Sequence, residues 1–203
     1  MSRQLQFDFG TSLGSRPPVC RARQAKGASD RLMFRLHPGQ PGAMAATVDA
    51  TCRAHGLTGK PCEADRLHVS LVGFDNGREI EEAAVQNVSA AAATVRAPAF
   101  DLAFDRIISF RSGKLKPLVL LCGESADLVV DLERRIVDAL NGAGLGVRRR
   151  AGFVPHCTVL YDNRLVPETR LDRPIIVPVT EFHLLHRKVG GWRRRVGSWP
   201  LLG

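Results

Sequence analysis

LHVSLVGF occupies residues 67–74, and HCTVLYD occupies residues 156–162. Each stretch contains a histidine that is followed, two positions later, by a small hydroxyl residue. The two histidines, His68 and His156, lie 88 residues apart. A His-x-Ser/Thr triplet is common by chance, so the pair indicates a function only if the sequence around it is repeated as well.

The sequence before each histidine follows the same plan. In the first half, a strand-like run at 31–36 precedes a helical pattern at 43–56 and a polar loop. In the second half, a strand-like run at 116–122 precedes a helical pattern at 126–141 and a loop rich in Gly and Arg. These patterns follow the usual periodicities of helices and strands. The two triplets therefore occupy matching places in two similar units, which indicates an internal duplication of layout.

The helix predicted at 126–141 has recognisable ends. Ser125 is placed to cap its N-terminus, and Gly142 follows its last turn, as Gly56 follows the other helix. The residues predicted to face the core recur at helical spacing: Leu128, Leu132, Ile136 and Leu140.

Further elements complete the predicted fold. A helix is predicted at 77–95 and a strand at 100–110, and strand-like runs at 175–189 and 192–201 flank Gly190-Gly191. A Gly-Gly pair between such runs is a hairpin signal. We expect an α+β protein with two pseudo-symmetric lobes, each a mainly antiparallel sheet backed by helices, that share strands across a central cleft.

The composition is that of a soluble globular protein, with 44% hydrophobic and 24% charged residues among 203. No run of 18 apolar residues occurs and the first residues lack a signal-peptide core, so we expect no membrane span and a cytoplasmic location. Residues 1–29 are interpreted as a flexible tail before a two-lobed domain at 30–203. Five cysteines without C-x-x-C spacing favour reduced thiols over disulfides or a zinc site.

The alternation of side chains along a strand brings the motif residues onto shared faces. His68 shares a face with Ser70, and His156 shares a face with Thr158. If the two strands lie side by side across a pseudo-two-fold axis, two imidazoles and two hydroxyls converge on one cleft. One neutral imidazole can then take a proton from an attacking hydroxyl or water, while the opposite imidazolium protonates the leaving oxygen. With the hydroxyls as donors to phosphate oxygens, the pattern predicts displacement at phosphorus without a metal.

At these residues the sequence resembles the two-histidine (2H) phosphoesterases, specifically the branch of 2′-5′ RNA ligases and RNA 2′,3′-cyclic phosphodiesterases. The signature of that family is a pair of His-x-Thr/Ser motifs on the inner strands of duplicated lobes, matched here by His68-Val69-Ser70 and His156-Cys157-Thr158. The resemblance covers about residues 30–200. It implies metal-free opening of a 2′,3′-cyclic phosphate to a 2′-phosphate and, in some members, reversible 2′-5′ joining of RNA ends. It also implies His68 as proton donor and His156 as proton acceptor, although the residues alone leave these roles interchangeable.

Two positions depart from the family pattern. Ser70 replaces the commoner Thr and keeps the hydroxyl. The second motif of this branch often has an Arg five residues after its histidine, and here that position is Tyr161, which simple alternation places on the face opposite His156. Arg150, with its neighbours Arg148 and Arg149, is a candidate to supply the missing charge.

Other side chains are candidate substrate contacts. The candidates for stacking on a base are Phe74, Phe153, Tyr161 and Trp192. The candidates for contact with phosphates, besides the motif hydroxyls, are Lys114, Lys116 and Arg193.

The net charge of +9 favours polyanionic partners. The expected partner is RNA or a nucleotide with a terminal cyclic phosphate, with no metal or other cofactor and no membrane, and the protein is expected to be a monomer. Two alternatives stay open. One is a non-catalytic RNA-binding protein that keeps the cleft as a ligand pocket, and the other is an enzyme acting on another cyclic nucleotide, such as ADP-ribose cyclic phosphate.

Overall fold

The computed structural model describes residues 30–75, 79–111, 114–188 and 193–202. The helices are α1 (Pro41–His55), α2 (Glu82–Ala92) and α3 (Ala126–Gly142), with 3₁₀ turns η1 (Ala64–Arg66) and η2 (Gly123–Ser125). The strands are β1 (Arg31–Leu36), β2 (Val69–Asp75), β3 (Phe100–Ser109), β4 (Lys116–Leu121), β5 (His156–Asp162), β6 (Thr169–Val179), β7 (Glu181–Arg187) and β8 (Arg193–Pro200). The predicted tail at 1–29 and the predicted Gly190-Gly191 turn lie outside the described residues.

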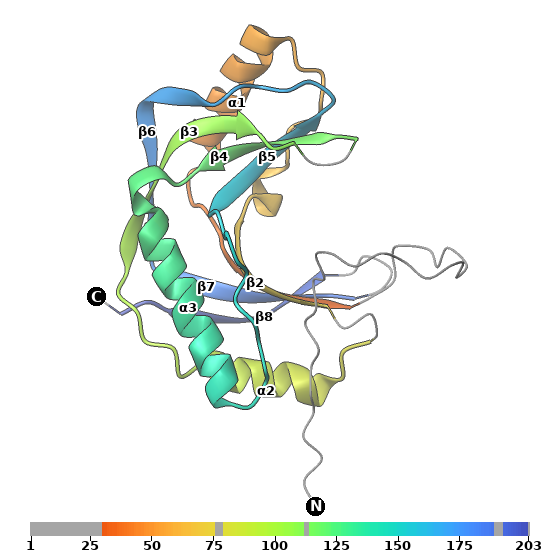
Figure 1. Cartoon of the computed structure of the whole chain (residues 1–203), viewed down its shortest axis with the longest axis vertical. Coiled ribbons are helices and arrows are strands. Elements are labelled where there is room, and N and C mark those ends of the chain that lie inside the picture. The colour runs from red at the N-terminus through yellow and green to blue at the C-terminus, as the bar shows by residue number, and fades with distance from the viewer. Residues whose placement is uncertain (1–29, 76–78, 112–113, 189–192, 203) are drawn as a thin grey trace, which may run out of the picture.

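The described strands form one antiparallel sheet in the order β6-β3-β4-β5-β2-β1-β7-β8. The prediction of an α+β fold with antiparallel strands is confirmed. The separate sheets expected of two lobes are instead the two halves of a single sheet, because β5 and β2 pair at its centre. Figure 1 shows the sheet bent about β2 and β5, so that its two halves meet at an angle and one side of the sheet is concave.

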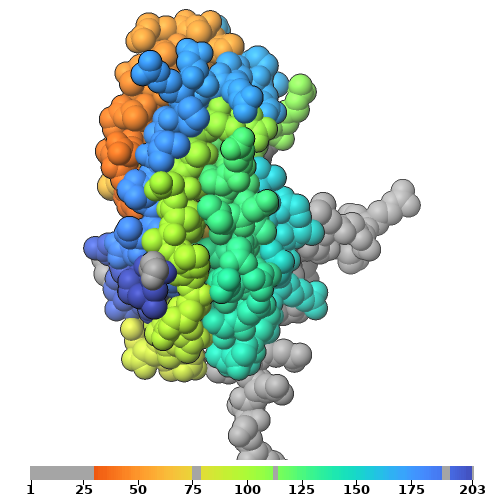
Figure 2. Space-filling view, turned by 90° about the vertical axis from the view of Figure 1, so that its left-hand side faces the viewer, coloured from red at the N-terminus to blue at the C-terminus, as the bar shows by residue number. Residues whose placement is uncertain are grey.

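The helices lie outside this concave side. α3 packs against β2 and α2, α2 reaches β8, and α1 contacts β5. Figure 2 looks onto the opposite side of the molecule, where α3 runs lengthwise beside the segment that contains β3. The concave side of the sheet is therefore the side on which a substrate can reach the central strands (Figure 1).

Two details of α3 differ from the prediction. Leu128 is 45% exposed, and Val129 takes its place in the buried face beside Leu132, Ile136 and Leu140. Ser125 makes no side-chain cap, because η2 leads directly into the helix. Its hydroxyl accepts a hydrogen bond from the N–H of Ala103 (2.9 Å) and donates one to the carbonyl of Cys122 (3.0 Å), so it ties the helix start to the sheet.

β2 and β5 each contain a β-bulge at the same distance from their histidine. On β2, Leu71 and Val72 together lie opposite Phe34 of β1. On β5, Val159 is the extra residue opposite β4. A bulge reverses the alternation of faces for the residues that follow it. The duplication predicted from the sequence thus extends to an irregularity of the backbone.

Candidate active site

The two histidine motifs meet at the centre of the sheet. Val69 of β2 pairs with Cys157 of β5, and both side chains are fully buried (0% exposed). Neighbouring residues on a strand point to the opposite face. One step to either side of this antiparallel pair, His68 lies opposite Thr158, and Ser70 lies opposite His156. Each imidazole therefore faces the hydroxyl of the other motif across a local two-fold axis.

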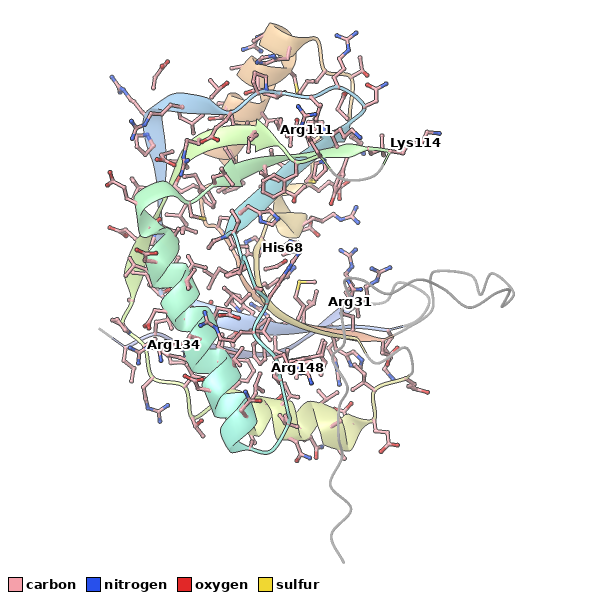
Figure 3. The ribbon with its side chains drawn as sticks, viewed as in Figure 1. Arg31, His68, Arg111, Lys114, Arg134 and Arg148 are labelled. Carbon is pink, nitrogen blue, oxygen red and sulfur yellow. The ribbon has the colours of Figure 1, made fainter. Side chains whose placement is uncertain are left out.

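These four motif side chains line one cavity of about 630 Å³. Figure 3 places His68 on the concave side of the sheet, between Arg31 on one half and Arg111 and Lys114 on the other. The sequence prediction that both imidazoles and both hydroxyls converge on one space agrees with this placement.

Both imidazoles are oriented in the same way. Nδ1 of His68 lies 2.7 Å from the carbonyl oxygen of Arg66, and Nδ1 of His156 lies 2.7 Å from the carbonyl oxygen of Val154. A carbonyl oxygen only accepts, so each Nδ1 carries a proton and donates it. Each Nε2 is then the atom that gains or loses a proton, and the backbone two residues upstream fixes its direction.

The surroundings of the two imidazoles differ. Burial, followed by the charges of Arg35 and Arg193, lowers the pKa of His68, while the hydrogen bond to the Arg66 carbonyl opposes this shift. The ring of His156 instead contacts Phe110 edge-on, with 4.9 Å between ring centroids. The neutral form of His68 is therefore favoured while the cavity contains no anion.

The Ser70 hydroxyl donates a hydrogen bond to the sulfur of Met33 at 3.3 Å. A thioether is a weak acceptor, so a phosphate oxygen would compete well for this hydroxyl. Thr158 faces the same cavity from β5.

The bulges change which residues face the cavity beyond the motifs. Tyr161, predicted on the face opposite His156, lines the cavity and is 49% exposed. Its counterpart five residues after His68 is Gly73. Phe74, a predicted substrate contact, is only 5% exposed and packs edge-on against Phe34 in the core, so it cannot stack on a base from there. Simple alternation gives the wrong face for Tyr161 and for Phe74, because each bulge adds one residue to its strand.

Arg150 was predicted to supply positive charge to the site, but the positive charge of the cavity comes from other residues. Arg150 is exposed but does not line the cavity, and its neighbour Arg149 pairs with Glu133 of α3 at 2.9 Å. The cations that line the cavity are Arg31, Arg35, Lys60, Arg66, Arg187 and Arg193. Of these only Arg193 was a candidate from the sequence. Arg31, Arg35 and Arg187 were missed because β1 and β7 reach the site only through long-range strand pairing. Lys60 and Arg66 lie in the segment before β2, which the sequence showed only as a polar loop.

None of the remaining candidates from the sequence that lie within the described residues lines the cavity. Lys114 and Lys116 do not line it. Phe153 is half-buried against the core, and Trp192 lies outside the described residues.

The segment between α1 and β2 forms one wall of the cavity and is held by Asp162. This buried carboxylate accepts hydrogen bonds from the backbone N–H groups of Arg164 (2.8 Å), Thr58 (2.8 Å) and Gly59 (2.7 Å). The bond from Arg164, with those from Thr58 and Gly59, lowers the pKa of Asp162. A Cβ on Gly59 would clash with the backbone carbonyl of Tyr161, so this close approach requires glycine.

The same wall also contacts the β5 bulge. The N–H of Cys62 donates to the carbonyl of Val159 at 2.8 Å, which satisfies the backbone of the bulged residue. The wall carries Lys60 and Arg66 to the cavity. Within the described residues, no group of three or more His, Cys, Asp or Glu is arranged to hold a metal ion. None of the described helices is long and apolar enough to cross a membrane.

Comparison with known families assigns the chain. The family model of the 2′-5′ RNA ligase superfamily matches residues 43–191, a range that contains both histidine motifs. The chain belongs to the 2′-5′ RNA ligase superfamily. The resemblance inferred from the paired motifs is therefore confirmed. No curated protein matches the chain.

Solved structures share the superfamily fold. LigT of E. coli complexed with NADP+ has 21% identity and a TM-score of 0.64, covering 86% of this chain and 99% of LigT. LigT complexed with 3′-AMP has 20% identity and a TM-score of 0.60, with the same coverage of both chains. TT0787 of Thermus thermophilus has 18% identity and a TM-score of 0.64, covering 85% of this chain and 98% of that chain. The likeness extends over nearly the whole length of these proteins.

Proposed function

We propose that this protein is a phosphodiesterase that opens 2′,3′-cyclic phosphates to 2′-phosphates. A water oxygen attacks phosphorus and its proton passes to the Nε2 of one neutral imidazole. The bond from phosphorus to the 3′ oxygen breaks, and that oxygen takes a proton from the Nε2 of the other imidazole. The products are a 2′-phosphate and a free 3′ hydroxyl, and exchange with solvent restores both histidines.

The observation that carries this proposal is the matched orientation of His68 and His156. Both rings line one cavity, and each donates Nδ1–H to a carbonyl at 2.7 Å. Such anchoring leaves Nε2 to exchange protons, and proton transfer by a positioned side chain typically contributes roughly 10²–10⁴ in rate. An acid and a base on opposite sides of one phosphorus atom are what in-line displacement requires.

Ser70 and Thr158 would bind the two non-bridging oxygens of the phosphate. Each hydroxyl faces the imidazole of the other motif, so the pair flanks the same space as the two rings. Donors fixed at these oxygens stabilise the charge of the transition state. Arg35 lies opposite Ser70 on β1, so it would add a positive charge next to the same phosphate. Its Nε is buried and has no hydrogen-bond partner among the described residues.

The same groups would also support 2′-5′ joining of RNA ends. If the 5′ hydroxyl of a second strand replaces water as the nucleophile, loss of the 3′ oxygen leaves a 2′-5′ phosphodiester. The proton transfers are the same as in hydrolysis, so the two reactions differ only in which hydroxyl occupies the attacking position.

The proposal is tested with nucleoside 2′,3′-cyclic phosphates in the presence of EDTA, with the products separated by chromatography. We expect 2′-phosphates to form, and we expect His68→Ala and His156→Ala each to lower kcat by roughly 10²–10⁴. His55→Ala is the matched control, because His55 lies at the end of α1 and does not line the cavity.

Two outcomes would favour the alternatives. Binding of RNA without any product, unchanged by either motif substitution, would indicate a non-catalytic RNA-binding protein. Turnover restricted to another cyclic nucleotide, such as ADP-ribose cyclic phosphate, would keep the reaction and replace the substrate.

A further inference from the structure

Three arginines form a row across the half-sheet that contains β1. Arg31 pairs directly with Arg187 of β7, and Arg187 pairs directly with Arg193 of β8. All three line the cavity. Adjacent strands lie ~4.8 Å apart, so the backbone of this arginine row spans about 10 Å. On its other side Arg31 lies opposite Asp75 of β2, whereas Arg187 has an arginine opposite it on both neighbouring strands. Like charges directly opposite each other on antiparallel strands are destabilising, so the position of Arg187 has a cost in the free protein.

Basic residues next to the row are neutralised by the protein itself. Arg194 pairs with Glu82 of α2 at 2.7 Å, and Lys188 pairs with Glu79 at 3.4 Å. Neither Arg187 nor Arg193 has such a carboxylate partner among the described residues. Among the described residues, Arg187 and Arg193 are therefore the members of the row whose charge a ligand could neutralise.

The charge of the cavity exceeds what one phosphate can balance. Its lining includes six Arg or Lys side chains and one carboxylate, Glu63. The reacting cyclic phosphate carries a single negative charge. Arg31 also lies four residues along β1 from Arg35, the residue opposite Ser70, which is ~13 Å of strand. The arginine row thus extends beyond the place where the reacting phosphate would bind.

The two half-sheets differ at the strands that flank the histidine motifs. Pro117 and Val119 of β4 occupy the positions that Met33 and Arg35 occupy on β1, as their pairing with β5 and β2 shows. The cation at position 35, next to the arginine row, is therefore a property of one half and does not follow from the duplication.

We propose that the arginine row binds the phosphate groups that precede the reacting one in a ribonucleotide chain. This inference rests on the proposed function and narrows its substrate to the 3′ end of an RNA strand. The chain would leave the central strands along β1 and β7, with its backbone over Arg187.

The test measures binding, so that it does not depend on turnover. A fluorescent oligoribonucleotide that ends in a 2′-phosphate is titrated with the protein at several salt concentrations, and a nucleoside 2′-phosphate serves as the short ligand. We expect Arg187→Gln to weaken the oligoribonucleotide about tenfold, the scale of one lost hydrogen bond to a charged group. The slope of the logarithm of the association constant against log salt is negative, and its magnitude should decrease by about 0.7 for one lost phosphate contact. Affinity for the nucleoside 2′-phosphate should stay within about twofold. Arg173→Gln, an exposed arginine on β6 at the opposite edge of the sheet, should change neither ligand.

Three results would overturn the inference. Equal losses for both ligands would place Arg187 at the reacting phosphate. A loss confined to the nucleoside 2′-phosphate would assign the row to small nucleotides. Unchanged binding of every ligand would remove the arginine row from recognition altogether. Failure of the proposed function would be recognised separately, as absence of turnover of any cyclic phosphate.

Discussion

The two half-sheets that meet at β2 and β5 present the same motif side chains in different surroundings. Each half contributes one histidine anchored through Nδ1 at 2.7 Å and one hydroxyl two residues later, and each carries a bulge after them. The two half-sheets differ at two matched positions. Arg35 faces Ser70 on one half where Val119 faces Thr158 on the other, and Gly73 corresponds to Tyr161.

Under the proposed function, this difference would let a symmetric pair of histidines perform an asymmetric reaction. If both half-sheets were alike, a phosphate could bind in either of two orientations and each imidazole would act as acid or base in turn. Cations on one half and the aromatic side chain of Tyr161 on the other would fix one orientation of the substrate. In the proposed reaction the motifs would supply the acid and the base, and the unequal surroundings would decide which histidine performs which step.

The largest expected effect separates the acid from the base. On a cyclic phosphate, we expect His68→Ala and His156→Ala each to lose roughly 10²–10⁴ in rate. An activated ester such as bis(p-nitrophenyl) phosphate has a leaving group that needs no protonation, so the variant that lacks the acid should recover most of its relative rate.

The variant that lacks the base should stay impaired on both substrates. Equal impairment of both variants on the activated ester would contradict a division of roles between the two half-sheets.

The next effect concerns the pair Tyr161 and Gly73. Stacking of a base on an aromatic side chain is worth ~1–3 kcal/mol, so Tyr161→Ala should raise KM about tenfold with a smaller change in kcat. Gly73→Ala is the matched control, since a Cβ there would meet only the carbonyl oxygen of Leu32 at 4.0 Å. A loss of kcat without a change in KM would assign Tyr161 to the reacting groups instead of to binding.

A smaller effect is expected from the wall between α1 and β2. Gly59→Ala forces the wall away from the backbone of Tyr161 and should destabilise the protein by ~1–3 kcal/mol, the usual cost of overpacking. Thermal unfolding measures this change. Gly39→Ala is its control, because nothing lies within 4 Å of a Cβ at that position. Equal melting temperatures for the two variants would show that the wall adapts without strain.

The smallest effect is a displacement of the pH profile. Arg35 lowers the pKa of His68, so Arg35→Gln should raise it toward its ordinary value of 6.5. The limb of kcat/KM that reports His68 should therefore move to higher pH, and Arg173→Gln should leave it in place. A limb that moves to lower pH in Arg35→Gln would mean that this arginine does not act on His68 through its charge.

Much of the fold follows from the sequence because local patterns determine it. The strands at 31–36 and 156–162 have the predicted bounds, since each is a short apolar run between turn residues. Gly56 ends α1 in the left-handed conformation, with φ at 60°, as its position predicted. The single run predicted at 175–189 contains the end of β6 and the whole of β7. The break between them was missed because an interruption of one residue, Thr180, has no turn signature.

The candidate site was predicted only as far as the first bulge. The positions of His68, Ser70, His156 and Thr158 follow from period-two alternation, which holds from each histidine to its hydroxyl. Bulges carry no sequence signature here, so the faces of residues farther along both strands could not be derived from alternation.

The cations on β1 and β7 were missed for a different reason. Arg35 and Arg187 reach the cavity because β1 and β7 pair in register, and a pairing between residues so far apart in the chain leaves no local pattern. Sequence patterns therefore locate the proposed reacting groups of this protein, while the cations on β1 and β7 that line the cavity emerge only from the pairing of the strands.

The most direct test of a shared site is a crystal structure with a nucleoside 2′-phosphate bound. We expect one phosphate between the two motifs, with Nε2 of His68 and Nε2 of His156 each within about 3.2 Å of its oxygens. The Ser70 and Thr158 hydroxyls should donate to the same group. A phosphate bound to only one histidine, or bound outside the cavity between β2 and β5, would contradict the account.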